Sequence, residues 1–196
     1  MVLRGPRRCR VARRVCCTGA MHLNPYGQGP LTLAVDLVNR PPADAADLER
    51  RCAAMDLLLE RAVVAEDLAA VLDFLARWAA VVDASDPHGR AERLNALLIE
   101  FSGPPRLTDH AGTGWHLHYR PDRLPAHRQI ASLIAVGTAL HLTGRGMRRL
   151  GRCAAPDCAH AYADFSRNGR QRYCSTTCGN RDAVRRHRAR AAEEFV

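Results

Sequence analysis

The chain has 196 residues, of which 47% are hydrophobic, so it can bury the core of one ordinary domain and carry a small additional module. Its formal net charge is +9, and every basic residue is an arginine. No apolar run approaches the roughly 20 residues that a membrane-spanning helix needs, so we expect no membrane partner.

The positive charge is concentrated at the two ends of the chain. Residues 1–20 hold six arginines and no acid, and residues 145–196 hold twelve arginines against five acids. The intervening part is mildly acidic. This asymmetry indicates a polyanionic partner, such as a nucleic acid, for the terminal segments.

The first twenty residues, MVLRGPRRCRVARRVCCTGA, predict a disordered, arginine-rich tail. They lack the apolar segment of a secretory signal, so we expect a cytoplasmic protein. Two interpretations remain open. The tail is either a basic arm that contacts phosphates or the product of a start codon assigned too early, with Met21 as the natural first residue.

Residues 21–144 predict a mainly helical domain. The stretch LTLAVDLVNR, residues 31–40, alternates apolar and other residues as a strand does, although a short helix is also compatible with it. Two prolines then end this element. Asp44 or Asp47 can cap the next helix, whose apolar face continues through Leu48 and Cys52 to Met55 and Leu59.

Three further helices and a hairpin follow. Apolar residues recur at helical spacing over 65–82, and Asp86-Pro87 opens a helix that continues to Phe101. Residues 105–119, PRLTDHAGTGWHLHY, predict a β-hairpin with two glycines in its turn. A last helix is expected over 126–142.

The hairpin carries His110, His116 and His118. The last two are two residues apart and would share one face of a strand, a geometry that metal sites use, but the pattern favours ordinary surface or half-buried histidines. The sequence has no glycine-rich phosphate loop, no G-x-S-x-G and no H-E-x-x-H, so we do not expect an enzyme. An active site near His116 and His118 is the less favoured alternative.

Four cysteines near the C-terminus predict a zinc site. Cys153, Cys158, Cys174 and Cys178 have the spacing C-x4-C-x15-C-x3-C, and two close pairs separated by such a loop are typical of one structural zinc ion. Disulfides are the alternative, which a reducing cytosol disfavours. His160 and His187 are stand-in ligands if one cysteine is free.

The order of elements around these cysteines predicts a treble-clef-like finger over 145–196. Asn168-Gly169 predicts a two-residue hairpin turn that places Ala163 opposite Cys174. A helix should follow to about Glu194, with Val184 and His187 packed on the hairpin. So small a module needs zinc to fold, at roughly 10 kcal/mol of binding free energy.

The same module predicts a nucleic-acid-binding surface. Arginines occupy the loop and most of the final helix, where only Asp182 interrupts them before Glu193, and a solvated helix would interleave more acids. The predicted contacts to phosphates and base edges are Arg167, Arg170, Arg172, Arg181, Arg185, Arg186, Arg188 and Arg190.

Residues 178–181 spell Cys-Gly-Asn-Arg, and RCAAPDCAHAYADFSRNGRQRYCSTTCGNR closely resembles the CGNR zinc finger. Through LTLAVDLVNR and the helices after it, the preceding region resembles the ABATE domain of stress-induced transcription regulators. The resemblance implies a zinc-dependent, DNA-binding bacterial regulator. The family phrase usually ends in Asn-Thr, whereas this chain has Asn39-Arg40.

The sequence therefore predicts a mainly α (α+β) protein, with a helical N-terminal domain that contains a β-hairpin, followed by the zinc finger. The expected function is transcription regulation at the nucleoid, with double-stranded DNA bound by the finger. The N-terminal domain would sense a small-molecule effector or form a homodimer. An RNA-binding or ribosome-associated zinc module is the main alternative, because treble clefs also dock on RNA.

Overall fold

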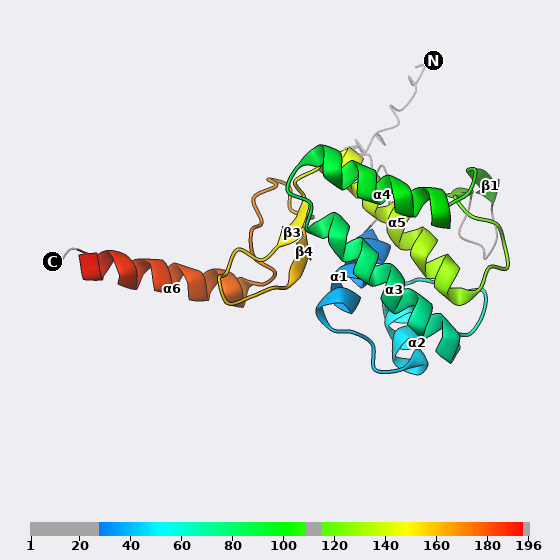
Figure 1. The fold of residues 1–196 in the computed structure, drawn as a ribbon, viewed down its shortest axis with the longest axis horizontal. Coiled ribbons are helices and arrows are strands. Elements are labelled where there is room, and N and C mark those ends of the chain that lie inside the picture. Colours follow the sequence, from blue (N-terminus) through cyan, green and yellow to red (C-terminus); the bar gives the residue numbers. More distant parts are fainter. Residues whose placement is uncertain (1–27, 109–114, 194–196) are drawn as a thin grey trace, which may run out of the picture.

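The computed structural model describes residues 28–108 and 115–193, and shows a helical body from which one long helix projects (Figure 1). The arginine-rich tail, His110 and the glycine turn of the predicted hairpin lie outside the described residues. Within them, the fold is mainly helical, with two small antiparallel sheets, as predicted. No helix in the described ranges is long and apolar enough to cross a membrane.

The first element, α1 (Gln28–Asn39), is a helix, so the strand interpretation of residues 31–40 is wrong and the helical alternative is right. Leu31, Ala34 and Leu37 are fully buried at helical spacing, and Leu33 is buried beside them. The apolar alternation arises because α1 packs against several neighbours and buries more than one stripe of side chains.

The next three helices follow the predicted pattern. Asp44 caps α2 (Ala45–Ala54) by accepting a hydrogen bond from the Asp47 amide at 2.7 Å. Helix α2 ends at Ala54, short of the predicted Leu59, and the left-handed backbone of Asp56 (φ 57°) turns the chain toward α3 (Ala65–Val82). Helix α4 (Pro87–Phe101) starts at the Asp86 cap.

A central helix, α5 (Ala126–Arg145), packs against α1, α3 and α4 and closes the core of the body. Trp78 of α3 is fully buried there, and its indole nitrogen donates to the Thr138 hydroxyl of α5 at 3.0 Å. Strands β1 (Arg106–Thr108) and β2 (His116–His118) pair antiparallel, as expected for the predicted hairpin. They lie at the end of the body away from the projecting helix (Figure 1).

Strands β3 (Leu150–Arg152) and β4 (Ala161–Ala163) form the second sheet, between the body and the projecting helix α6 (Thr176–Glu193) (Figure 1). Leu150 pairs with Ala163, and both belong to the core of the body. The short sheet therefore anchors the C-terminal module on the helical body.

Two predicted details of the module are wrong. The ladder expected around Asn168-Gly169 does not form: Ala163 pairs with Leu150 instead of Cys174, because β3 occupies one edge of β4 and the Asn39 side chain binds the other at Ala161. The predicted packing of Val184 and His187 on the hairpin is also wrong, since both side chains are exposed on a helix that extends away from the sheet.

Candidate metal centre

The four predicted zinc ligands come from two parts of the module. Cys153 and Cys158 flank the knuckle that connects β3 to β4. Cys174 precedes α6, and Cys178 lies in its first turn. The Ser175 hydroxyl accepts a hydrogen bond from the Cys178 amide at 3.2 Å, so the start of the helix is fixed at the site.

The geometry of the four sulfurs fits a zinc ion. All four lie within 4.8 Å of one another, and the Cys174 sulfur is 3.7 Å from that of Cys158 and 3.6 Å from that of Cys178. Zinc–sulfur bonds of about 2.3 Å hold tetrahedral sulfurs roughly 3.8 Å apart. The four cysteines therefore fit one structural zinc ion, and their closed shell leaves no position for a reacting water.

The electrostatics of the cluster are compatible with such an ion. Burial and the three neighbouring thiols raise the pKa of Cys174 to about 12. Burial also raises the pKa of Cys153, but hydrogen bonds led by the amides of Cys174 and Ala155 outweigh it and lower that pKa below its ordinary value. Four thiolates cannot be held this close at neutral pH unless a cation compensates them.

Neither stand-in histidine belongs to the cluster of potential ligands found among the described residues. The Nδ1 atom of His160 lies 3.9 Å from the Cys174 sulfur, at contact distance, while His187 is exposed on α6. The backbone amide of His160 also donates a hydrogen bond to the sulfur of Cys158. His160 therefore contacts two of the ligand sulfurs and does not replace a ligand.

The loop between β4 and Cys174 is organised by Asp164, which sequence reasoning missed. Its buried carboxylate accepts hydrogen bonds from the amide and hydroxyl of Ser166 and from the amide of Gln171. Arg149 pairs with the same carboxylate at 3.4 Å. Gly169 does adopt a left-handed conformation, with φ 65°, as glycine in a tight turn can, but it does so in this carboxylate-centred loop and not in the predicted two-residue hairpin.

The eight predicted nucleic-acid-binding arginines are all exposed, three on this loop and five on α6. Three of them make ion pairs. Arg185 and Arg186 both pair with Asp182, at 2.6 and 3.1 Å, and Arg181 pairs with Asp157 at 3.1 Å. The other five, Arg167, Arg170, Arg172, Arg188 and Arg190, make no ion pair with a side chain that the structure describes, which on α6 means those up to Ala191.

Asp182 and Tyr173 also form a connection that the sequence pattern did not indicate. The Tyr173 hydroxyl donates to Asp182 at 2.7 Å and joins the loop to α6. Arg185, then Tyr173, lower the pKa of Asp182 to about 2, although its burial opposes them. Arginines three and four residues after an aspartate are a helix-pairing signal, but the tyrosine contact depends on the tertiary fold.

The histidines of β2 lie together: the Nε2 atoms of His116 and His118 are 3.1 Å apart. The Asp122 carboxylate lies 4.0 Å from the Nδ1 atom of His118, but among the described residues no third ligand atom gathers with the two histidines into a possible metal site. The remaining predicted member of that group, His110, is outside the described residues.

The fold and the cysteine cluster define a helical protein with a C-terminal structural zinc module. Residues 149–191 match the model of the CGNR zinc finger family, and this segment contains all four cysteines and both sides of the site. No curated protein sequence matches the chain at a significant level.

Proposed function

We propose that this protein is a zinc-dependent, DNA-binding transcription regulator of the bacterial nucleoid. The module would bind double-stranded DNA through α6 and the loop of residues 164–173. The helical body would sense a small-molecule effector or form a homodimer, because one small module covers little DNA surface by itself. The proposal assigns no catalytic step to either part.

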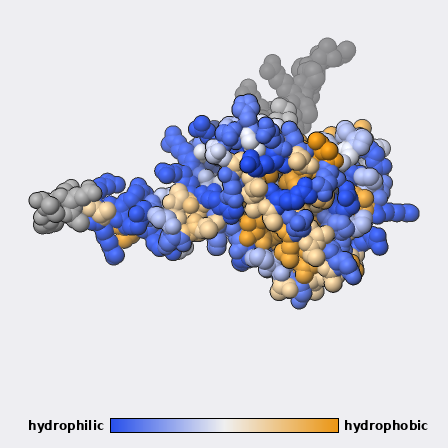
Figure 2. All heavy atoms as spheres, in the orientation of Figure 1, coloured by the Kyte–Doolittle hydropathy of each residue, from blue (hydrophilic) through white to orange (hydrophobic). Residues whose placement is uncertain are grey.

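The observation that carries this proposal is the exposed positive charge of the projecting helix, which is densest in arginine beyond its ion-paired first half. Helix α6 extends away from the body, and its surface is mostly hydrophilic (Figures 1 and 2). Arg188 and Arg190 lie in its distal half, where no side chain described up to Ala191 pairs with them. A helix of about 10–12 Å diameter fits a major groove about 12 Å wide, and unpaired guanidinium groups suit phosphates and guanine edges.

The loop supports the same proposal because it holds its arginines on a fixed backbone. Asp164 and Arg149 fix the backbone of the loop from inside, so Arg167, Arg170 and Arg172 extend into solvent. An ordered loop loses little conformational entropy when its side chains meet phosphates. Helix and loop together offer two sets of cations on one zinc-stabilised support.

Fluorescence anisotropy of the full zinc-loaded chain with duplex DNA and with single-stranded RNA, across a salt series, tests the proposal. We expect duplex binding that is lost with a chelator and whose log affinity falls by about 0.9 per contacted phosphate per decade of salt. Tighter binding to single-stranded RNA would favour the RNA-binding alternative. Binding that is absent, or indifferent to the chelator, would contradict both.

A further inference from the structure

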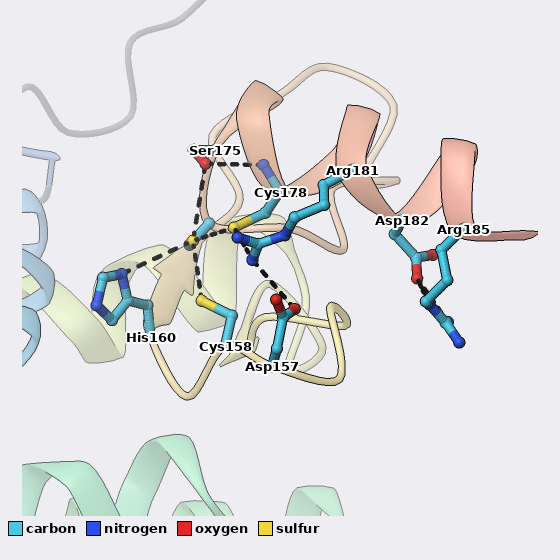
Figure 3. A network of polar contacts seen from close by, with 9 residues as sticks. Asp157, Cys158, His160, Ser175, Cys178, Arg181, Asp182 and Arg185 are labelled. Carbon is cyan, nitrogen blue, oxygen red and sulfur yellow. Dashed lines mark hydrogen bonds and ion pairs between the residues drawn. The ribbon is translucent and has the colours of Figure 1, made fainter.

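Arg181, the last residue of the Cys-Gly-Asn-Arg segment, differs from the other arginines of the module because it contacts the metal centre. Its Nη2 atom lies 3.7 Å from the Cys178 sulfur and 3.1 Å from the Asp157 carboxylate (Figure 3). It follows Cys178 by three residues on α6, so the two side chains lie on the same face of the helix.

This one guanidinium connects the two halves of the cysteine cluster. Cys178 belongs to α6, whereas Asp157 directly precedes the ligand Cys158 in the knuckle. Apart from the metal itself, Arg181 is thus a link between helix and knuckle at the level of the sulfurs. The planar guanidinium can serve two acceptors at once in a fixed geometry, which a lysine ammonium cannot do in the same way.

The charge of the centre explains why a cation belongs here. Four thiolates around one zinc ion carry a net charge of about −2, which a nearby guanidinium compensates in part. Hydrogen bonds to thiolate ligands orient them and tune how tightly the metal is held. The Arg181 side chain is 52% exposed, so it lies at the rim of the centre and not within it.

We infer that Arg181 is a positioning residue of the zinc centre, and that it acts on the Cys178 thiolate and the knuckle instead of on nucleic acid. The direct contacts would then come from arginines without ion pairs, such as Arg188. This inference depends on the zinc site and not on the proposed function, and the two can fail separately.

The first test is zinc affinity, measured with the full chain by competition against a chromophoric chelator. Arg181→Ala should weaken zinc binding by about 10- to 100-fold, and Arg181→Lys should weaken it less because the charge is kept. Arg188→Ala is the matched control, since it removes an equal charge from the same helix and should leave zinc affinity unchanged. Wild-type zinc affinity in Arg181→Ala would overturn the inference.

The second test is the salt dependence of duplex binding at saturating zinc. Arg181→Ala should keep the wild-type slope, whereas the slope for Arg188→Ala should be smaller in magnitude by about 0.9, the value of one phosphate contact. A loss of slope in Arg181→Ala like that in Arg188→Ala would also overturn the inference. If even the wild-type chain binds no duplex, the proposed function fails, but the zinc competition still decides the role of Arg181.

A third variant covers the case in which Arg181→Ala does not fold. Asp157→Asn keeps Arg181 and loosens only its connection to the knuckle, so it should weaken zinc binding relative to wild type while Arg188→Ala does not. The double variant Asp157→Asn/Arg181→Lys should lose less zinc-binding free energy than the sum of the losses in the two single variants, because both changes act on the same Arg181–Asp157 contact. Full additivity would show that the two residues act independently and would contradict the inference.

Discussion

Asp67 connects two helices of the body through a single buried carboxylate. It accepts hydrogen bonds from the His127 ring at 2.6 Å and from the amides of Val64 and His127, each at 3.1 Å. Burial raises the pKa of Asp67, but these hydrogen bonds, led by that of the His127 ring, outweigh it and hold the pKa below its ordinary value. The ionised carboxylate therefore stabilises the junction between the starts of α3 and α5.

Replacing Asp67 by Asn should destabilise the body by about 1–3 kcal/mol at pH 7, because the amide has one acceptor oxygen for three donors. A lowered folded-state pKa means that the carboxylate contributes fully above its unfolded value of about 3.9, and that this contribution is lost as the pH falls through the folded value. The difference between variant and wild type in urea unfolding should therefore shrink between about pH 5 and pH 3. A difference that is constant over this range would contradict the role of the charge.

Cys174 lies within 4 Å of two other ligand sulfurs, so its loss should open the zinc centre. We expect Cys174→Ser to bind much less zinc and to lose the module's share of the cooperative transition in a circular-dichroism melt, since zinc supplies roughly 10 kcal/mol to such a module. Cys52→Ala is the control, because this buried thiol lies in the body and its loss should leave the zinc content intact. A melt of Cys174→Ser that matches wild type would refute the structural role of the metal.

Two glycines test the organisation of the loop, because Gly169 has a left-handed backbone in the loop and Gly144 has an ordinary helical one in α5. Gly169 has φ 65°, and a Cβ there would lie 2.6 Å from the Arg149 guanidinium carbon, which its contacts with Ser166 and Asp164 hold in place. Gly169→Ala should cost about 1–2 kcal/mol. Gly144, near the end of α5, has open space around it, so Gly144→Ala should stabilise by about 0.4–1 kcal/mol.

Thermal melts of these two variants give the comparison. Opposite shifts in Tm are expected, and equal shifts would contradict the fixed loop. The duplex-binding slope of Gly169→Ala should also fall if the loop arginines contact phosphates, because the strained backbone would no longer hold them in place.

Local signals in the sequence predicted most of the helices, because capping and apolar spacing are properties of neighbouring residues. Asp44 and Asp86 cap their helices as expected, and the cysteine spacing identified the site. The helical spacing of Leu31, Ala34 and Leu37 was obscured by Leu33, which neighbouring elements also bury. The dipeptide Asn168-Gly169 favours a tight hairpin locally. In the structure, Asp164 binds the loop amides and β3 pairs with β4, and these two tertiary contacts cannot be inferred from the dipeptide.

Asn39, at the end of α1, binds the edge of the second sheet that β3 leaves open. Its side chain donates to the Ala161 carbonyl at 2.9 Å and accepts from the Ala161 amide at 2.7 Å, as a neighbouring strand would. Arg152 of β3 forms a two-point ion pair with Asp83 at the end of α3. These contacts join residues that are distant in the sequence, so the spacing of residue types could not predict them. The boundary between the two predicted domains at residue 144 remains a prediction.

Because Ala161 is fully buried, Asn39→Ala should leave a backbone amide and a carbonyl unpaired and cost about 1–3 kcal/mol for each. Asn39→Asp is the sharper variant, since it keeps the acceptor but at neutral pH sets a carboxylate oxygen against the Ala161 carbonyl, so its loss should shrink at low pH, where the protonated carboxyl can donate again. Urea unfolding followed by far-ultraviolet circular dichroism measures both. A loss in Asn39→Asp that does not shrink at low pH relative to that in Asn39→Ala would contradict the strand-like pairing of this side chain.

The same contacts couple the zinc centre to the stability of the body. Leu150, Ala161 and Ala163 are buried in the core of the body, yet the knuckle between their strands carries two of the zinc ligands. Removing zinc with a chelator should therefore lower the Tm of the helical transition as well as unfold the module, and Asn39→Ala should reduce this coupling by weakening the connection. Calorimetry of the zinc-loaded and chelated chains checks it: a body transition at the same temperature in both would mean that the sheet stays folded without the metal, and the coupling would be refuted.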